Sequence, residues 1–199
     1  MSVKKRFEEM YEKGELPWDT GRPDFNLINI VTQMPILKCK ALDIGCGTGS
    51  NAIWLAQKGF EAVGCDLVEI PIKRALKKAS YLNLNIPFYV IDFLKDEILE
   101  APFDFLFDRG CFHSFESDDD RKKFAEKAAF NLKNEGLWLS MIGTCDDKRK
   151  EKGPPKRSLR DIARAIEPYF KILSIKSGCF DSNRDVPSKA WICLMQKRI

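Results

Sequence analysis

Three glycines at alternate positions, Gly45, Gly47 and Gly49, follow an apolar segment that carries an acidic residue, Asp43, near its end. Glycine lets the backbone turn tightly and allows a ligand to lie directly against the chain. The segment behind the glycines has the pattern of a helix, and the first amide groups of a helix are donors without partners. The sequence therefore predicts a loop at residues 45–49 that binds a polar ligand.

The spacing of the glycines separates two classes of nucleotide ligand. The dinucleotide fingerprint is G-x-G-x-x-G, but Ser50 occupies the position of its third glycine. The carboxylate of Asp43 would repel a pyrophosphate and suits an ammonium or sulfonium group. Asp66 ends the next apolar segment, close to the roughly 20-residue spacing expected of a ribose-binding acid. These residues predict an adenosine ligand with a positively charged amino-acid tail.

The segment from Asp43 to Gly49, followed by Asp66, resembles the S-adenosylmethionine site of class I methyltransferases. In that family the glycine loop holds the amino-acid part of the cofactor, and the second-strand acid binds both ribose hydroxyls. An Asp after the third strand binds the adenine amino group, and Asp92 with Phe93 matches that position. The resemblance spans nearly the whole chain and implies S-adenosylmethionine as the cofactor.

Apolar segments alternate with segments of helical period, which predicts a doubly wound α/β fold of the Rossmann type. We expect a mostly parallel seven-stranded sheet with helices on both faces. The last two predicted strands follow each other closely and predict an antiparallel pair at one edge, as in class I methyltransferases. The predicted strands are residues 37–44, 60–66, 86–91, 103–108, 136–143, 169–176 and 189–195. We expect one domain over residues 1–199, with a helical lid at residues 1–35 and a core at residues 36–199.

Trp18 lies between Pro17 and Gly21, which places it on a loop ahead of the glycines. Two interpretations are open: Trp18 packs the N-terminal helix onto the body, or it forms the wall of a lid over the cofactor, with Arg22 near a carboxylate. The Trp-x-x-Gly-Arg-Pro segment is similar to small-molecule methyltransferases of the thiopurine, thiol and tellurite-resistance group. We therefore favour the lid.

The segment after the fourth predicted strand reads Asp108-Arg109-Gly110-Cys111-Phe112-His113. His113 is the single histidine, and histidine can act as a general base near neutral pH. The alternative is a partly buried histidine satisfied by a backbone hydrogen bond. The segment is similar to the same group of methyltransferases, where this loop lines the cofactor and acceptor sites. We name His113 and Asp108 as catalytic candidates, and expect all four strand-end acids to lie at the rim of the crevice.

The predicted cofactor-binding residues come from the lid, the glycine loop and the ends of the strands. They are Trp18, Arg22, Asp43, Gly45, Cys46, Gly47, Thr48, Gly49, Asp66, Leu67, Asp92, Phe93, Asp108 and Arg109. We predict no metal site, because the acidic run at residues 118–120 stands where a helix begins and is expected to cap it.

Composition limits the partners. The net charge of +4 is too slight to argue for nucleic acid by itself. The Asn/Asp-Pro-Pro-aromatic motif of amino-directed DNA methylation is missing after the fourth strand, whereas a basic loop at residues 148–160 keeps RNA or an acidic protein open. The 7 cysteines include no C-x-x-C pair, and no apolar signal core or membrane-spanning run is present, so a reducing cytoplasm is expected.

The resemblance implies an S-adenosylmethionine-dependent methyltransferase that acts on a small molecule. We expect direct in-line transfer to a soft nucleophile, with a thiol or a chalcogen oxyanion favoured, in a monomer or homodimer. The alternatives are a methyltransferase-like binding module without catalysis, and a methyltransferase that acts on RNA or protein. A nicotinamide oxidoreductase comes third, because Ser50 and Asp43 disfavour a dinucleotide.

Overall fold

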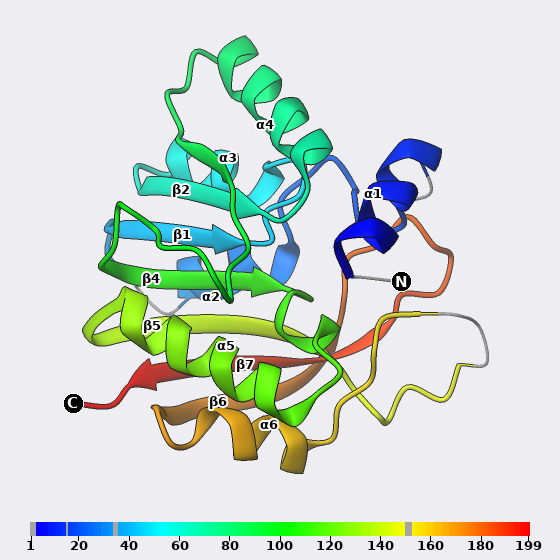
Figure 1. Cartoon of the computed structure of the whole chain (residues 1–199), viewed down its shortest axis with the longest axis vertical. Helices are drawn as coiled ribbons and strands as arrows, with labels where there is room; N and C mark the ends of the chain where they lie inside the picture. Colours follow the sequence, from blue (N-terminus) through cyan, green and yellow to red (C-terminus); the bar gives the residue numbers. More distant parts are fainter. Residues whose placement is uncertain (1–2, 15, 34–35, 150–152) are drawn as a thin grey trace.

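The computed structural model describes residues 3–14, 16–33, 36–149 and 153–199. Seven strands form one sheet, with helices on both faces (Figure 1). The strands are β1 (Lys40–Ile44), β2 (Glu61–Asp66), β3 (Phe88–Val90), β4 (Phe103–Arg109), β5 (Leu132–Gly143), β6 (Phe170–Cys179) and β7 (Lys189–Lys197). The helices are α1 (Val3–Lys13), α2 (Phe25–Gln33), α3 (Ser50–Gln57), α4 (Glu69–Tyr81), α5 (Asp118–Asn131) and α6 (Leu159–Ile166), with a 3-10 turn, η1, at Phe112–Ser114. None of these helices is long and apolar enough to cross a membrane.

The strand order is β3-β2-β1-β4-β5-β7-β6. Strands β1 to β5 pair in parallel, whereas β7 runs antiparallel to both β5 and β6. The predicted fold class is therefore confirmed, including the antiparallel pair at one edge. The chain leaves β1 toward β2 and β3, and later returns to add β4 on the other side. In open α/β sheets, ligands bind outside the carboxyl ends of the strands at such a switch point.

Two apolar cores hold the helices against the sheet. On one face, Leu27 of α2, Leu55 of α3 and Ala75 of α4 are fully buried in one cluster. On the other face, Phe124 of α5 and Ile162 of α6 are fully buried in a second cluster. Because both faces are covered, the rigid sheet presents its carboxyl edge, and the loops on it, as the place for a site.

Local capping explains where α5 begins. The side chain of Ser117 accepts a hydrogen bond from the amide of Asp120, and the three acids at 118–120 form the first turn of the helix. Negative charge is favourable there because the N-terminal end of a helix dipole is positive. The acidic run thus lies at the start of the helix as predicted, but the side chain that caps the helix is that of Ser117.

Strand boundaries differ from the prediction where polar residues obscure the pattern. Strand β5 begins at Leu132, directly after α5, although the expected start was residue 136. Residues 133–135, near the start of the strand, are exposed. The apolar pattern that marks the rest of the strand is therefore missing there. The expected boundary between lid and core, at residues 34–35, and two residues of the basic loop, Lys150 and Lys152, lie outside the described residues.

Candidate functional site

The glycine loop connects β1 to α3 and needs its glycines for backbone conformation. Gly45, Gly47 and Gly49 have φ angles of 68°, 54° and 80°, in the left-handed region that disfavours other residues. A Cβ on Gly49 would also lie 2.8 Å from the Cβ of Ala75 and 2.9 Å from the ring of Phe88. The loop is therefore bare of side chains at its three glycines, and the third glycine lets α3 begin close to α4 and β3.

The residues between the glycines anchor the loop. The amide of Cys46 donates to the carbonyl of Cys65 (2.9 Å), and burial raises the pKa of the Cys46 thiol well above its usual range. The hydroxyl of Thr48 donates to Asp19 (2.8 Å) and accepts from Lys78 (2.7 Å). Cys46 thus stays a protonated apolar residue, and Thr48 joins the glycine loop to the N-terminal segment and to α4.

Asp43 carries a buried carboxylate next to this loop. The residue is 1% exposed, and its Oδ2 has no hydrogen-bond partner among the described residues. Burial raises the pKa of Asp43 to about 8, opposed by the amide of Ala52 and reinforced by the carboxylates of Asp66 and Asp108. The expectation of four acids at the rim is wrong for Asp43 and Asp108, because both are buried within their strands. An unpaired buried carboxylate oxygen is a ready partner for a cationic ligand group.

Asp66 ends β2 on the other side of the loop. Its Oδ2 accepts from the amide of Gly47 (3.0 Å) and its Oδ1 from the amide of Val68 (2.9 Å). Burial raises the pKa of Asp66, and the same amides oppose that shift. Asp66 and the following Leu67 are both half-buried, so this turn remains accessible beside the glycine loop.

The turn after β3 carries two predicted cofactor-binding residues, Asp92 and Phe93, whose side chains have different surroundings. Asp92 is half-buried and accepts from the amide of Leu94 (3.1 Å), with Lys95 at 2.8 Å from its other oxygen. Phe93 is 5% exposed, and its ring lies 4.6 Å from the ring of Phe124 in the second core. Asp92 therefore keeps a place at the rim, whereas the side chain of Phe93 contributes packing.

The described part of the predicted lid reaches the glycine loop through a residue that sequence reasoning missed. Trp18 packs edge-on against Phe7 and Tyr11 of α1, with ring centroids 5.8 and 6.3 Å apart. Tyr11 is 3% exposed, and its hydroxyl lies 3.1 Å from where a Cβ on Gly47 would stand. Burial and the carboxylate of Asp66 raise the pKa of Tyr11, so its phenol stays protonated. The signal in the sequence was only the helical spacing of an amphipathic helix.

Two arginines predicted to bind the cofactor instead join loops of the chain. Arg22 is exposed and forms a bidentate pair with Asp181, at 2.8 and 2.6 Å. The half-buried Arg109 donates to Asp24 (2.6 Å), to the carbonyl of Trp18 (3.1 Å) and to the carbonyl of Asp181. The segment around Trp18 is thereby fastened to the loop between β6 and β7.

Asp108 organises the loop after β4. It is fully buried; its Oδ1 accepts from the amides of Cys111 (3.0 Å) and Phe112 (2.9 Å), and its Oδ2 from the indole of Trp138 (3.0 Å). Burial raises the pKa of Asp108 to about 6, and the hydrogen bonds from Phe112, Trp138 and Cys111 oppose that shift. Both oxygens are thus occupied within the chain.

His113 has the features of the alternative interpretation, a buried histidine satisfied by a backbone hydrogen bond. The residue is 4% exposed, and its Nδ1 accepts a hydrogen bond from the amide of Gly143 (2.8 Å). Burial, assisted by Arg157 and Arg109, lowers the pKa of His113 to about 3. Because Nδ1 accepts, the proton of the neutral ring lies on Nε2, so the ring can donate a hydrogen bond but has no lone pair free to take a proton.

The basic loop after β5 uses much of its charge internally. Arg157 donates to the carbonyls of His113 and Phe115, both at 2.8 Å. Arg149 pairs with the buried Asp147, and Lys156 donates to the carbonyl of that same residue. These contacts fasten the loop over η1, and the charge of Arg149 is paired with an acid, whereas Lys156 and Arg157 meet neutral carbonyls.

Comparison with known proteins places these features in context. A family profile described as a methyltransferase domain matches residues 41–136, which contain the glycine loop, Asp66 and Asp108. The chain is 29% identical over 174 residues to a probable thiol methyltransferase 2 of Arabidopsis thaliana, covering 85% of this chain and 75% of that protein. It is 28% identical over 180 residues to thiocyanate methyltransferase 1 of Brassica oleracea, covering 86% and 76%.

Among solved structures, one comes from work on the conversion of a disulfide bond into a thioacetal group during echinomycin biosynthesis. It superposes with a TM-score of 0.80 at 23% identity, covering 92% of this chain and 84% of that one. At this identity the superposition supports the fold alone: the order of strands and the position of the glycine loop at their carboxyl edge.

Proposed function

Because the chain belongs to the class I S-adenosylmethionine-dependent methyltransferases, we propose that it methylates a small molecule at a soft nucleophile, with a thiol or a chalcogen oxyanion favoured. One observation carries this choice: both candidate bases, Asp108 and His113, are buried and hydrogen-bonded within the chain. A soft nucleophile arrives deprotonated and needs no base, whereas a hydroxyl or ammonium acceptor must lose a proton.

The cofactor is S-adenosylmethionine, and the residues around the glycine loop fit it. When bound, it supplies an electrophilic methyl group on a positively charged sulfur. The unpartnered Oδ2 of Asp43 and the bare glycine loop suit its cationic amino-acid part. We propose that Asp66 binds the ribose hydroxyls and Asp92 the adenine amino group, as the family resemblance implies.

The chain itself then contributes orientation and exclusion of water. We propose that the described lid residues Tyr11 and Trp18 cover the amino-acid end of the cofactor, since the Tyr11 hydroxyl lies beside Gly47 and Trp18 packs against the Tyr11 ring. On the acceptor side, Nε2–H of His113 can donate a hydrogen bond, and Arg157 holds the backbone of that loop in place. Arg22 and Arg109 fasten the lid rather than touch the ligand.

The relatives support the same class of acceptor. Their names specify a thiol and thiocyanate, and both offer a polarisable sulfur as the nucleophile. The alternative acceptors, RNA and protein, gain little from the basic loop, because Arg149 is paired with Asp147 and the side chains of Lys156 and Arg157 are fixed on backbone carbonyls of the chain.

The test is an acceptor screen that measures S-adenosylhomocysteine formation with thiophenol, sulfide, selenite, tellurite, catechol and a primary amine. The sulfur and chalcogen acceptors should turn over, with a pH dependence that follows the pKa of the free acceptor. His113→Asn keeps an oxygen that can accept from Gly143 and should retain thiol methylation within about threefold, since loss of a general base costs about 10²–10⁴-fold.

Preference for catechol or the amine would contradict the proposal. So would a hundredfold loss in His113→Asn with cofactor affinity unchanged, because His113 would then act as a base. Calorimetric titration with S-adenosylhomocysteine separates a loss of cofactor binding from a loss of acceptor chemistry.

A further inference from the structure

A groove lies between α3 and α4, on the helical face behind the glycine loop. Its volume is about 610 Å³, within the roughly 300–1,000 Å³ typical of small-molecule sites. Residues 19, 21 and 23 of the N-terminal loop line part of its wall. The groove is lined by helix side chains rather than by the ends of β2 and β4, so it lies apart from Asp66 and Asp108.

Three cations of α4 line this groove: Arg74, Lys77 and Lys78. Their spacing of three and four residues places them on one face of the helix. Arg74 donates to the carbonyl of Tyr11 (3.3 Å) and Lys78 to the hydroxyl of Thr48 (2.7 Å), both neutral oxygens. No ion pair within the described part of the chain involves any of the three. Their positive charge is therefore not neutralised by a paired acid among the described residues.

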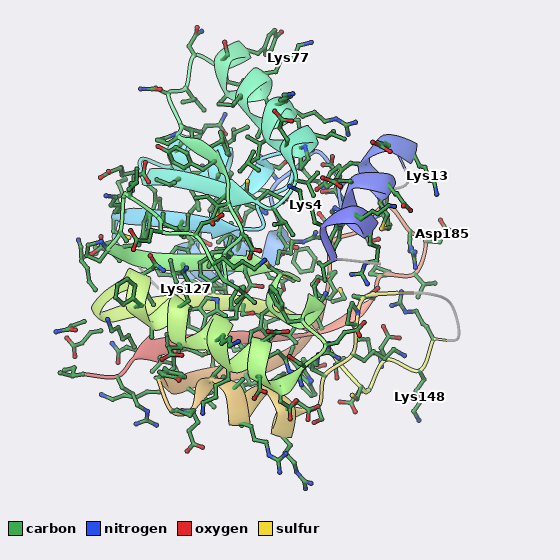
Figure 2. All side chains as sticks on the ribbon, viewed as in Figure 1. Lys4, Lys13, Lys77, Lys127, Lys148 and Asp185 are labelled. Carbon is green, nitrogen blue, oxygen red and sulfur yellow. The ribbon has the colours of Figure 1, made fainter. Side chains whose placement is uncertain are left out.

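Among the described residues that line the groove, one acid, Asp19, offsets only part of this charge. Asp19 accepts from the hydroxyl of Thr48 at 2.8 Å and belongs to the same chain of hydrogen bonds as Lys78. Lys77 is exposed and projects from near the carboxyl end of α4 (Figure 2). A ligand anion would find at least this ammonium group without displacing any contact of the chain.

Much of the remaining lining is apolar. One polar atom in it has no hydrogen-bond partner among the described residues. Ile53, Trp54 and Leu82 supply carbon surface, and the exposed ring of Tyr81 flanks it. Ser50, which also lines the groove, has a buried hydroxyl without a hydrogen-bond partner among the described residues. Such a surface matches a ligand with a flat apolar body, and the cations match a negative group on it.

We propose that this groove binds a small organic anion, a carboxylate or phosphate carried on an aromatic body. Charge complementarity with Arg74, Lys77 and Lys78 selects the anion, and the carbon surface around Trp54 selects the ring. The limited volume favours a small molecule over a polyanion such as RNA. This site is distinct from the cofactor and acceptor sites proposed above.

The test is calorimetric titration of the full chain, saturated with S-adenosylhomocysteine, with phenyl phosphate, benzoate, inorganic phosphate and phenol. Phenyl phosphate or benzoate should bind saturably at one site per chain, and comparing the two identifies the preferred head group. Inorganic phosphate, which lacks the ring, and phenol, which is neutral, should each bind at least tenfold more weakly.

Lys77→Glu should weaken binding of the aromatic anion at least tenfold, because it reverses the charge of the exposed cation. Lys73→Glu is the matched control: it makes the same change of net charge on the same helix, but Lys73 lies outside the groove and pairs with Glu69. That variant should stay within about twofold of the unmodified chain, and melting temperatures verify that both variants fold.

Three results would overturn the proposal. Equal affinity of Lys77→Glu and the unmodified chain would move the ligand out of the groove. Binding seen only without S-adenosylhomocysteine would assign the anion to the cofactor site. Binding of a single-stranded RNA that depends on Lys77, with no binding of phenyl phosphate or benzoate, would assign the surface to a polyanion.

Discussion

The proposed cofactor side and the proposed acceptor side of the sheet edge hold their buried carboxylates differently. On the cofactor side, formed by the ends of β1 and β2 and the glycine loop, Asp43 has an oxygen without a partner among the described residues. On the acceptor side, formed by the end of β4, η1 and the loop after β5, Asp108 accepts three hydrogen bonds at its two oxygens. Burial raises the pKa of both, to about 8 and about 6.

This difference indicates what each side is built to meet. A buried charge without a partner lowers the stability of the free protein, and a ligand of opposite charge recovers that loss on binding. A fully bonded carboxylate instead fixes the backbone around it. We therefore propose that the cofactor side selects its ligand by charge, whereas the acceptor side offers a rigid shape. The predictions below test that contrast, in order of decreasing effect.

The largest effect is expected at Gly49, where the cofactor side depends on the absence of a side chain. Gly49→Ala places a Cβ at 2.8–2.9 Å from Ala75 and Phe88 and should lower the free energy of unfolding by about 3 kcal/mol or more, through overpacking and strain. Gly21→Ala is the control, because Gly21 has a similar φ of 71° but open space around it. It should cost only about 1–2 kcal/mol from the left-handed backbone.

Urea unfolding of the two variants measures the difference. Equal losses would mean that the backbone conformation alone sets the requirement for glycine. The close packing of α3 against α4 would then contribute nothing to the free energy of unfolding at this position.

The next effect concerns binding by Asp66. Asp66→Ala should weaken S-adenosylhomocysteine binding by about 2 kcal/mol, the scale of hydrogen bonds to a charged group. Calorimetric titration measures this loss, and Asp66→Asn controls for the amides of Gly47 and Val68, because it keeps an oxygen that can accept from one of them. Unchanged affinity in the alanine variant would remove Asp66 from the ribose role.

The raised pKa of the buried Asp43 should make the free energy of unfolding depend on pH. Its pKa is about 8 in the folded chain and about 3.9 when unfolded, so between these values the folded state holds a proton that unfolding releases. Stability is then lost as the pH rises through this window, at up to about 1.4 kcal/mol per pH unit. Asp43→Asn never ionises, so its stability relative to the unmodified chain should rise by about 1.4 kcal/mol between pH 6 and pH 7.

Urea unfolding at pH 6 and pH 7 gives this difference directly, because the other titrating groups are common to both chains. The same substitution should weaken cofactor binding, since the amide carries no charge. A stability difference that does not change with pH would show that Asp43 is already ionised in the folded chain, and would contradict the contrast with Asp108.

The sequence predicted more about the cofactor side than about the acceptor side. The reason is how far apart in the sequence the contacting residues lie. The glycine loop is local: its spacing, Asp43 before it and Asp66 after the next strand are visible within one stretch of chain. The fold class followed from the alternation of strands and helices and is confirmed by the sheet order. The exact position of β5 did not follow, because polar residues open that strand.

The acceptor side and the lid depend on partners far apart in the chain. The amide of Gly143 donates a hydrogen bond to His113, and Arg109 donates to both Asp24 and Asp181. No local sequence pattern indicates these pairs. Tyr11 was missed for a related reason. A tyrosine at helical spacing has the same pattern whether it faces a core or a glycine loop.

The smallest effect should come from Arg22, which was predicted to bind the cofactor but pairs with Asp181 on the surface. Exposed ion pairs contribute little to stability, so Arg22→Gln should leave the urea midpoint of unfolding nearly unchanged. Cofactor affinity should stay within about twofold, since Arg109 continues to hold Asp24 and the carbonyl of Trp18. Asp181→Asn serves as the partner variant, and the double variant should be no worse than the sum of the two. A tenfold loss of cofactor affinity in Arg22→Gln alone would place this guanidinium on the cofactor side, and the lid would then recognise charge as the glycine loop does.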